Sequence, residues 1–180
     1  IKHLLFASSS SVYGMNQKQP FSTSDNTDFP ISLYAATKKS NELLAHSYSH
    51  LFDLPCIGLR FVTVYGPFGR PDMSYFKFTK AIIAGDSIDV FNNGIMKRDF
   101  TYIDDIIGGI TLLIGKLPIN QENTITASNA PFKVYNIGNN APVTLDRFIK
   151  AIEKATGRRA KRNLLPMQPG DVPLTYADID

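Results

Sequence analysis

The sequence predicts an α/β protein, with part of a doubly wound parallel sheet followed by a smaller α+β domain. Residues 3–8 and 57–64 are short apolar runs, which are typical of strands buried inside a parallel sheet. The segment between them, 32–52, is long and has a helical period, so the order is strand, helix, strand, as in a parallel crossover unit. Beyond residue 67 the elements become shorter and more varied, which indicates a second, smaller domain.

The elements of the first part are bounded by recognisable residues. A polar loop with several prolines, 14–30, leads from the first strand into the long helix. Apolar or aromatic residues give that helix its period, at positions 33, 36, 43, 44, 48, 51 and 52. Asp53 and Pro55 end the helix, and Gly66-Pro67 closes the second strand.

The second part alternates short helices and strands. The expected elements are, in order, a helix at 75–84, strands at 88–91 and 99–103, a helix at 106–114, a surface loop at 120–130, a strand at 134–137, a helix ending at Ala155 and a strand at 161–165. Thr144 is placed to cap the helix before Ala155, and Gly157 is placed to stop it.

The charge of the chain argues against a nucleic-acid partner. The 180 residues carry a formal charge of +3, with a pI of about 8.9. Nucleic-acid binding needs a concentrated basic stripe, and this surplus is too small to supply one. The densest basic group follows the stop at Gly157 and is typical of a solvated helix end: Arg158, Arg159, Lys161 and Arg162. A modest positive charge still suits an anionic small ligand.

The cysteine content, the hydropathy and the histidine spacing argue against disulfides, a membrane span and a metal site. Cys56 is the only cysteine, so an intrachain disulfide is impossible and a reducing compartment is favoured. No apolar stretch reaches the roughly 20 residues of a membrane span, and the N-terminus lacks the pattern of a signal peptide. His46 and His50 are four residues apart, but no carboxylate or cysteine completes a metal-binding set. We expect a cytoplasmic protein with no membrane or metal partner.

The first candidate catalytic group is the segment Tyr-Ala-Ala-Thr-Lys at 34–38. Tyr34 and Lys38 are four residues apart on the expected helix, so they lie on one face and share one site. An ammonium beside a phenol favours the phenolate, and such a tyrosine acts as a general base on an alcohol. The alternative is an ordinary surface turn, since the chain has eight tyrosines.

The second candidate is the serine-rich turn SSSSVYG at 8–14, just past the end of the first strand. In doubly wound sheets, ligands bind at the carboxyl ends of the strands. Hydroxyl groups placed there can hydrogen-bond a sugar oxygen that undergoes proton transfer. The alternative is a serine-rich turn that binds no ligand.

Taken together, the two groups resemble the extended branch of the short-chain dehydrogenase/reductase family. A serine turn stands 25 residues before Tyr-x-x-x-Lys, and the further motifs follow in the order of that branch: LRFVTVYGP, RDFTYIDD, YNIG and QPGDV. The segments GLRFVTVYGPFGRPDM and MKRDFTYIDD are most similar to those of UDP-glucuronate 4-epimerases. This resemblance spans essentially the whole chain, and it implies a Rossmann-type domain joined to a substrate-binding domain.

The resemblance implies NAD as cofactor and a UDP-sugar as substrate. It makes Ser9 the catalytic hydroxyl, Tyr34 the base and Lys38 the partner of that base, which also holds the nicotinamide ribose. Phe61 matches a position where the backbone meets the nicotinamide. The implied reaction is 4-epimerisation through a transient 4-keto sugar, with UDP-glucuronate and UDP-galacturonate as the favoured pair.

Hydroxyl side chains distinguish this class from its relatives. Related dehydratases and UDP-xylose-forming decarboxylases have acidic side chains at one or both of the positions of Ser10 and Ser11. Galactose-type epimerases have an asparagine at the position of Thr63. The three hydroxyls suit a uronate carboxylate, while another UDP-hexose or a UDP-N-acetylhexosamine is the alternative substrate.

Further residues match nucleotide-binding positions of the family. Arg98 matches the arginine that binds the diphosphate, with an ion pair to Asp99 as the alternative, and Arg70 is a second diphosphate candidate. The remaining matches are Val90 and Phe91, which flank the uracil, and Asp171, a carboxylate near the nucleotide ribose.

The resemblance also divides the chain. Residues 1–66 correspond to the C-terminal part of the NAD-binding domain and 67–180 mainly to the sugar-nucleotide domain, with 99–116 and 134–138 returning to the first. The sequence has no Gly-x-Gly-x-x-Gly turn to bind the NAD pyrophosphate. We therefore expect the C-terminal portion of a longer enzyme, catalytically silent in isolation. Dimers of the family commonly pair through the Tyr-x-x-x-Lys helix and its neighbour, which makes a homodimer of the full-length enzyme plausible.

Overall fold

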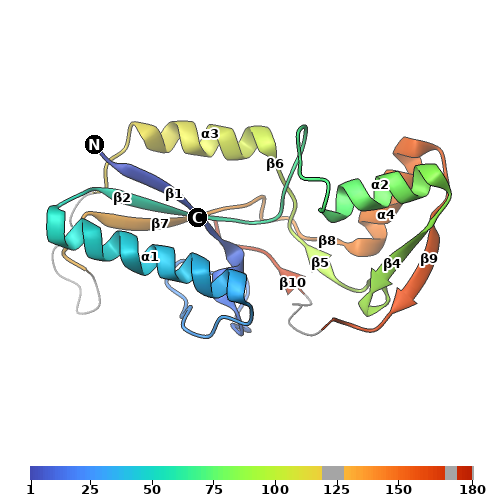
Figure 1. The fold of residues 1–180 in the computed structure, drawn as a ribbon, viewed down its shortest axis with the longest axis horizontal. Coiled ribbons are helices and arrows are strands. Elements are labelled where there is room, and N and C mark those ends of the chain that lie inside the picture. Colours follow the sequence, from blue (N-terminus) through green and yellow to red (C-terminus); the bar gives the residue numbers. More distant parts are fainter. Residues whose placement is uncertain (119–127, 169–173, 180) are drawn as a thin grey trace.

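The computed structural model describes residues 1–118, 128–168 and 174–179, and its elements gather into two lobes (Figure 1). The first lobe contains a parallel three-stranded sheet between two helices. In the second lobe, two helices pack on a parallel pair of strands. The predicted α/β class with parallel strands is therefore confirmed.

The sheet of the first lobe places three strand ends side by side. Its strands are, in spatial order, β1 (Leu4–Ser9), β2 (Cys56–Phe61) and β7 (Phe132–Ile137). Ser9 lies opposite Phe61, which lies opposite Ile137, so the three carboxyl ends form one edge. Helix α1 (Leu33–Phe52) covers one face of the sheet and α3 (Ile103–Ile114) covers the other (Figure 1). A ligand site is expected at that edge in a doubly wound sheet.

Helix α1 begins and ends where the sequence predicts. The Ser32 side chain accepts a hydrogen bond from the Ala35 N–H at 3.1 Å, which satisfies one unpaired donor of the first turn. Asp53 ends the helix with a left-handed backbone, at φ 50°. These two local signals fix where Tyr34 and Lys38 lie along the helix.

The second lobe has an apolar core between its helices and strands. Its elements are α2 (Ser74–Ala84), β4 (Ser87–Phe91), α4 (Leu145–Thr156) and β9 (Lys161–Leu165). The buried core consists of Ile82, Ile88, Val90 and Ile149. Thr144 caps α4 by accepting from the Arg147 N–H, and Gly157 ends it at φ 67°, both as the sequence predicts.

The strand predicted at 57–64 ends early, at Phe61. Val62 is fully buried, and its N–H donates to the carbonyl of the last residue of β7 at 3.0 Å. The chain then leaves the sheet, and Val64–Tyr65 forms a separate strand, β3, which pairs with β6 (Thr101–Tyr102). The prediction was wrong at its end because an apolar run does not reveal which partner each residue pairs with.

The strand predicted at 99–103 is shorter in the structure, where only Thr101–Tyr102 forms a strand and Asp99 lies outside it. Strand β5 (Lys97–Arg98) ends before this residue, β6 begins after it, and α3 begins at Ile103 rather than at Ile106. The Asp99 side chain is fully buried. Its carboxylate accepts three backbone N–H groups of the turn after β7, at 3.0 to 3.2 Å, from Asn139, Asn140 and Ala141. Asp99 therefore binds the turn between the lobes instead of continuing a strand.

Gly138 opens that turn and lies close to the same carboxylate. A Cβ atom at Gly138 would lie 2.9 Å from Asp99 Oδ2 and 3.2 Å from the Val62 side chain. A contact that short requires a shift of one of these buried groups, so the turn needs glycine.

Short elements complete the described chain. They are η1 (Ser10–Tyr13), η2 (Asn92–Gly94), β8 (Val143–Thr144) and β10 (Leu174–Thr175). The remaining predicted elements agree with the structure to within one or two residues, and the loop predicted at 120–130 lies mostly outside the described residues. Among residues 1–118, 128–168 and 174–179, no helix is both long and apolar enough to cross a membrane.

Candidate active site

Ser9 ends β1 at the carboxyl edge of the sheet. Its backbone is extended, and its hydroxyl caps η1 by accepting from the Ser11 N–H at 3.2 Å. The same hydroxyl donates to Ser11 Oγ, also at 3.2 Å. Ser9 is only 9 % exposed, and its hydroxyl is held by these two hydrogen bonds within the turn.

Tyr34 and Lys38 lie on the first two turns of α1, beside that strand end. Lys38 Nζ lies 5.8 Å from the centroid of the Tyr34 ring. It also donates to the Ala7 carbonyl at 3.0 Å, two residues before Ser9. Tyr34 itself is 53 % exposed, so its hydroxyl is accessible to a ligand. The structure therefore brings the predicted phenol and ammonium to the end of the strand that carries Ser9.

A buried ion pair lies behind the serine turn. Arg60 Nε and Nη2 donate to the two carboxylate oxygens of Glu42, at 2.9 and 2.8 Å, and both side chains are 5 % exposed. The Ser8 hydroxyl donates to Glu42 Oε1 at 2.5 Å. We call this group the Glu42–Arg60 pair, and it was not among the residues that the sequence predicted.

The two charges of the pair hold each other ionised. Burial alone would raise the pKa of the Glu42 carboxyl, but hydrogen bonds and charge from Arg60, with the Ser8 hydroxyl, hold it below its usual range. Burial alone would lower the pKa of the Arg60 guanidinium, and Glu42 more than offsets that effect, so this pKa is raised. Both groups therefore remain charged near neutral pH.

Tyr13 extends the buried network to the far strand. The Arg60 guanidinium lies 4.8 Å from the centroid of the Tyr13 ring, within the range of a cation–π contact. The Tyr13 hydroxyl donates to Asn136 Oδ1 on β7 at 2.6 Å. Burial raises the pKa of the Tyr13 phenol, with Arg60 opposing it, so this tyrosine stays protonated. Asn136 in turn donates to the carbonyls of Phe21 and Asp178.

The hydroxyl residues predicted to contact the sugar come from adjacent strand ends. Ser10 and Ser11 open η1 directly after β1, and both are half-buried. Thr63, also half-buried, lies two residues beyond Phe61, the end of β2. Because β1 and β2 are paired with Ser9 opposite Phe61, both sets of residues lie at the same edge.

The predicted nucleotide-binding residues belong mainly to the second lobe. Arg98, on β5, donates to the Lys97 carbonyl, and no ion pair joins it to Asp99 in the part of the chain that the structure describes. Arg70 is exposed and makes a two-bond contact with the Asp72 carboxylate, at 3.1 and 2.9 Å. Phe91 is half-buried, whereas the Val90 side chain lies in the core, and Asp171 lies outside the described residues.

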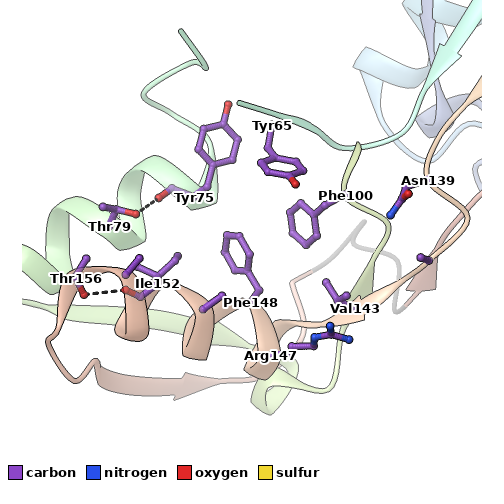
Figure 2. A pocket seen from close by; sticks show the side chains of 13 residues that line it. Tyr65, Tyr75, Thr79, Phe100, Asn139, Val143, Arg147, Phe148, Ile152 and Thr156 are labelled. Atoms are coloured by element: carbon purple, nitrogen blue, oxygen red, sulfur yellow. Dashed lines mark hydrogen bonds between the residues drawn. The ribbon is translucent and has the colours of Figure 1, made fainter. Parts of the chain in front are cut away.

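A separate apolar pocket opens between α2 and α4 in the second lobe. Its volume is about 470 Å³, and Figure 2 shows the rings of Tyr65, Phe100 and Phe148 turned toward it. Phe100 and Phe148 stack with ring centroids 4.8 Å apart. Of the site residues predicted from the sequence, none that the structure describes lines this pocket. The described residues also contain no group of three or more His, Cys, Asp or Glu side chains suited to a metal ion.

Sequence reasoning missed Glu42, Arg60 and the role of Asp99. A charged residue inside an apolar strand such as CIGLRF signals a buried charge that needs a partner. Arg60 gave that signal. Its partner, Glu42, could not be identified from the sequence, because it lies on α1 and meets Arg60 only when the helix packs on the sheet. The partners of Asp99 are backbone groups about forty residues away, for which the sequence holds no signal.

Comparison with known proteins assigns the chain to a family. The model of the NAD dependent epimerase/dehydratase family matches residues 1–138. "Protein CapI" of Staphylococcus aureus is 59 % identical over an alignment of 186 positions that covers 100 % of this chain and 56 % of that protein. "Probable UDP-glucuronate 4-epimerase" of Rhizobium meliloti is 51 % identical, over 99 % of this chain and 54 % of that protein.

A solved structure agrees with the fold. UDP-glucuronic acid 4-epimerase from Bacillus cereus, in complex with UDP-glucuronic acid and NAD, superposes with a TM-score of 0.82 at 36 % identity. The superposition covers 97 % of this chain and 52 % of that one. The chain thus spans about half the length of the relatives that it matches.

Proposed function

The chain belongs to the NAD-dependent epimerase/dehydratase family, and from this premise we propose that the full-length protein is a UDP-sugar 4-epimerase acting on UDP-glucuronate. The observation that carries the proposal is the Lys38 ammonium, which lies 5.8 Å from the centroid of the Tyr34 ring and donates to the Ala7 carbonyl, two residues before Ser9. The choice of sugar is supported by similarity, along nearly the whole chain, to the UDP-glucuronic acid 4-epimerase of Bacillus cereus and to the "Probable UDP-glucuronate 4-epimerase" of Rhizobium meliloti.

The three side chains have complementary roles in the proposed reaction. Tyr34 takes the proton from the C4 hydroxyl of the sugar. The Lys38 ammonium, 5.8 Å from the centroid of the Tyr34 ring, places a positive charge beside this base. The Ser9 hydroxyl donates a hydrogen bond to the same sugar oxygen. After the 4-keto sugar has turned over in the pocket, Tyr34 returns the proton to the oxygen on the other face.

The residues present fit the nicotinamide end of NAD. When bound, NAD supplies the hydride acceptor and donor for C4 of the sugar. The Lys38 ammonium and the accessible Tyr34 hydroxyl suit the ribose hydroxyls beside the nicotinamide, and Phe61 offers its backbone at the adjacent strand end. The sequence has no glycine-rich turn for the pyrophosphate, so we assign only the nicotinamide end to this chain.

The choice of a uronate rests on Ser10, Ser11 and Thr63. Their half-buried positions at the ends of β1 and β2 would surround the sugar with hydroxyl donors. A carboxylate accepts several such hydrogen bonds, whereas acidic side chains at these places would repel it. Neither Ser10 nor Ser11 is an acid or base suited to removing water, so dehydration is disfavoured.

The second lobe would bind the nucleotide. We propose that Arg98 contacts the diphosphate and that Arg70 leaves Asp72 to do the same, since a guanidinium matches phosphate oxygens in geometry and charge. Phe91 would contact the uracil through its ring and Val90 through its backbone, because the Val90 side chain is buried. The Asp171 carboxylate is proposed to lie near the ribose of the nucleotide. Residues 1–66 with 99–116 and 134–138 would then form the cofactor side, and the rest the nucleotide side.

A homodimer is part of the proposal. Helix α1 exposes a large apolar face, made of Leu33, Leu43, Leu44, Tyr48, Leu51 and Phe52. Exposed apolar area of this extent is typical of a surface that another element covers. Two copies of α1 packed against each other would cover part of it in the full-length protein.

Substrate preference tests the proposal. The full-length gene product is expected to turn over UDP-glucuronate with a kcat/KM at least about a hundredfold above that for UDP-glucose, because hydroxyls placed for a carboxylate are left unpaired by the neutral sugar. Thr63→Val, which removes one hydroxyl at nearly constant volume, should lower kcat/KM for UDP-glucuronate about tenfold and leave UDP-glucose little changed. Equal or better turnover of UDP-glucose or a UDP-N-acetylhexosamine would reassign the sugar.

A further inference from the structure

The Glu42–Arg60 pair holds the serine turn on both of its sides. At the start of the turn, Ser8 donates to Glu42 at 2.5 Å. Near its end, the Tyr13 ring lies 4.8 Å from the Arg60 guanidinium. Ser9, Ser10 and Ser11 lie between these two contacts. One buried ion pair therefore contacts the turn on both sides of Ser9, Ser10 and Ser11.

The same pair also ties the turn to the helix that carries the base. Tyr34, Lys38 and Glu42 follow one another at intervals of four residues, so they lie along one face of α1. Lys38 binds the Ala7 carbonyl and Glu42 binds the Ser8 hydroxyl. Two consecutive residues of β1, directly before Ser9, are thus attached to the helix face that carries Tyr34.

The chemistry of the pair suits the holding of a fixed geometry. Burying two charges is costly, and apolar residues of similar volume often stabilise a fold as well or better. A two-bond contact between guanidinium and carboxylate has one well-defined geometry, unlike packed aliphatic side chains. Here it joins β2 to α1, at 2.8 and 2.9 Å, directly behind the turn.

We propose that Glu42 and Arg60 are positioning residues, which hold the Ser9 hydroxyl in register with Tyr34 through Ser8 and Tyr13. The inference rests on the proposed function, because Ser9 and Tyr34 are the groups that it aligns. Neither residue of the pair touches the substrate in this account. Their effect on the reaction therefore passes through Ser9.

A double-mutant cycle in the full-length gene product tests whether Glu42 acts through Ser9. Glu42→Gln keeps the shape of the side chain but removes its charge, and it should lower kcat about tenfold with little change in KM, since small misplacements of catalytic groups slow the chemical step. In a Ser9→Ala background the same change should lower kcat less than about twofold, because the group being aligned is gone. Equal losses in the two backgrounds would show that Glu42 does not act through Ser9.

Two further variants separate positioning from general destabilisation. Arg60→Lys keeps the charge and loses the two-bond contact, so it should reproduce most of the kcat loss of Glu42→Gln while staying folded. Glu153→Gln is the matched control: Glu153 is a largely buried carboxylate on α4 that accepts from the Ala160 N–H at 2.9 Å, far from the serine turn. It is expected to lower the melting temperature with no change in kcat.

Hydrogen–deuterium exchange tests the structural claim without any assay of activity. In Glu42→Gln, amides of residues 8–13 should exchange at least about tenfold faster, while those of β4 and β9 in the second lobe keep their rates, because the change affects the anchor of the turn. Unchanged exchange at 8–13 would overturn the inference even if kcat fell. If the wild type epimerised no UDP-sugar, the proposed function would fail, and faster exchange would still establish the pair as the anchor of the turn.

Discussion

Replacing Tyr34 with phenylalanine in the full-length gene product is expected to lower kcat for 4-epimerisation by roughly 10²- to 10⁴-fold, the usual contribution of a general base. The change removes a single hydroxyl. Without it, no group of this constellation can take the proton from the C4 hydroxyl while the hydride leaves C4. Lys38 would remain bound to the Ala7 carbonyl, so the sheet edge should keep its shape.

The measurement is steady-state kinetics beside a thermal melt. Tyr34 is 53 % exposed, so the variant should fold with a melting temperature close to that of the wild type. Tyr48→Phe is the control, since Tyr48 lies on the same helix, is similarly exposed at 57 %, and is assigned no role in the reaction. Activity of Tyr34→Phe within a few-fold of wild type would remove Tyr34 from the proposed mechanism.

Replacing Asp99 with alanine is expected to lower the free energy of unfolding by about 3 kcal/mol or more, since it removes three hydrogen bonds from backbone N–H groups to a charged acceptor. Those N–H groups belong to Asn139, Asn140 and Ala141 in an exposed turn, and the Asp99 side chain that binds them is fully buried. A loss of that size would lower the melting temperature by roughly 6 to 12 °C in a domain of this length.

Two comparisons make the Asp99 prediction specific. Asp89→Ala removes an exposed carboxylate that accepts one hydrogen bond from Asn163, and it should change stability by less than about 0.5 kcal/mol. Asp99→Asn keeps one acceptor oxygen for the two N–H groups that bind Oδ2, so its cost should be intermediate. If Asp99→Ala were as stable as Asp89→Ala, the assigned role of the carboxylate would be wrong.

Local chemistry in the sequence was sufficient to predict much of the fold. Thr144 was predicted to cap a helix because its side chain accepts from an N–H three residues later, a contact that needs no distant partner. The long helix between two apolar runs predicted the crossover unit for a similar reason. The errors occur where contacts with distant residues determine the local structure. At Asp99, the carboxylate binds a turn forty residues away.

In the candidate site too, the residues set by local contacts could be predicted and those set by distant contacts could not. Tyr34 and Lys38 could be predicted because both lie on one helix, and Ser9 because it follows an apolar strand. The Glu42–Arg60 pair could not be predicted in full, because its members lie on different elements and only the crossover brings them together. The apolar pocket beside Phe100 and Phe148 likewise depends on how α4 packs in the second lobe.

In the proposed reaction, hydride leaves C4 of a UDP-sugar and returns to the same carbon at a site built from Ser9, Tyr34 and Lys38. The direct test is to incubate the full-length protein with UDP-glucuronate carrying deuterium at C4 and to follow the products by NMR and mass spectrometry. We predict UDP-galacturonate with the deuterium retained at C4. Deuterium lost to solvent, or a dehydrated or decarboxylated product in place of the epimer, would contradict it.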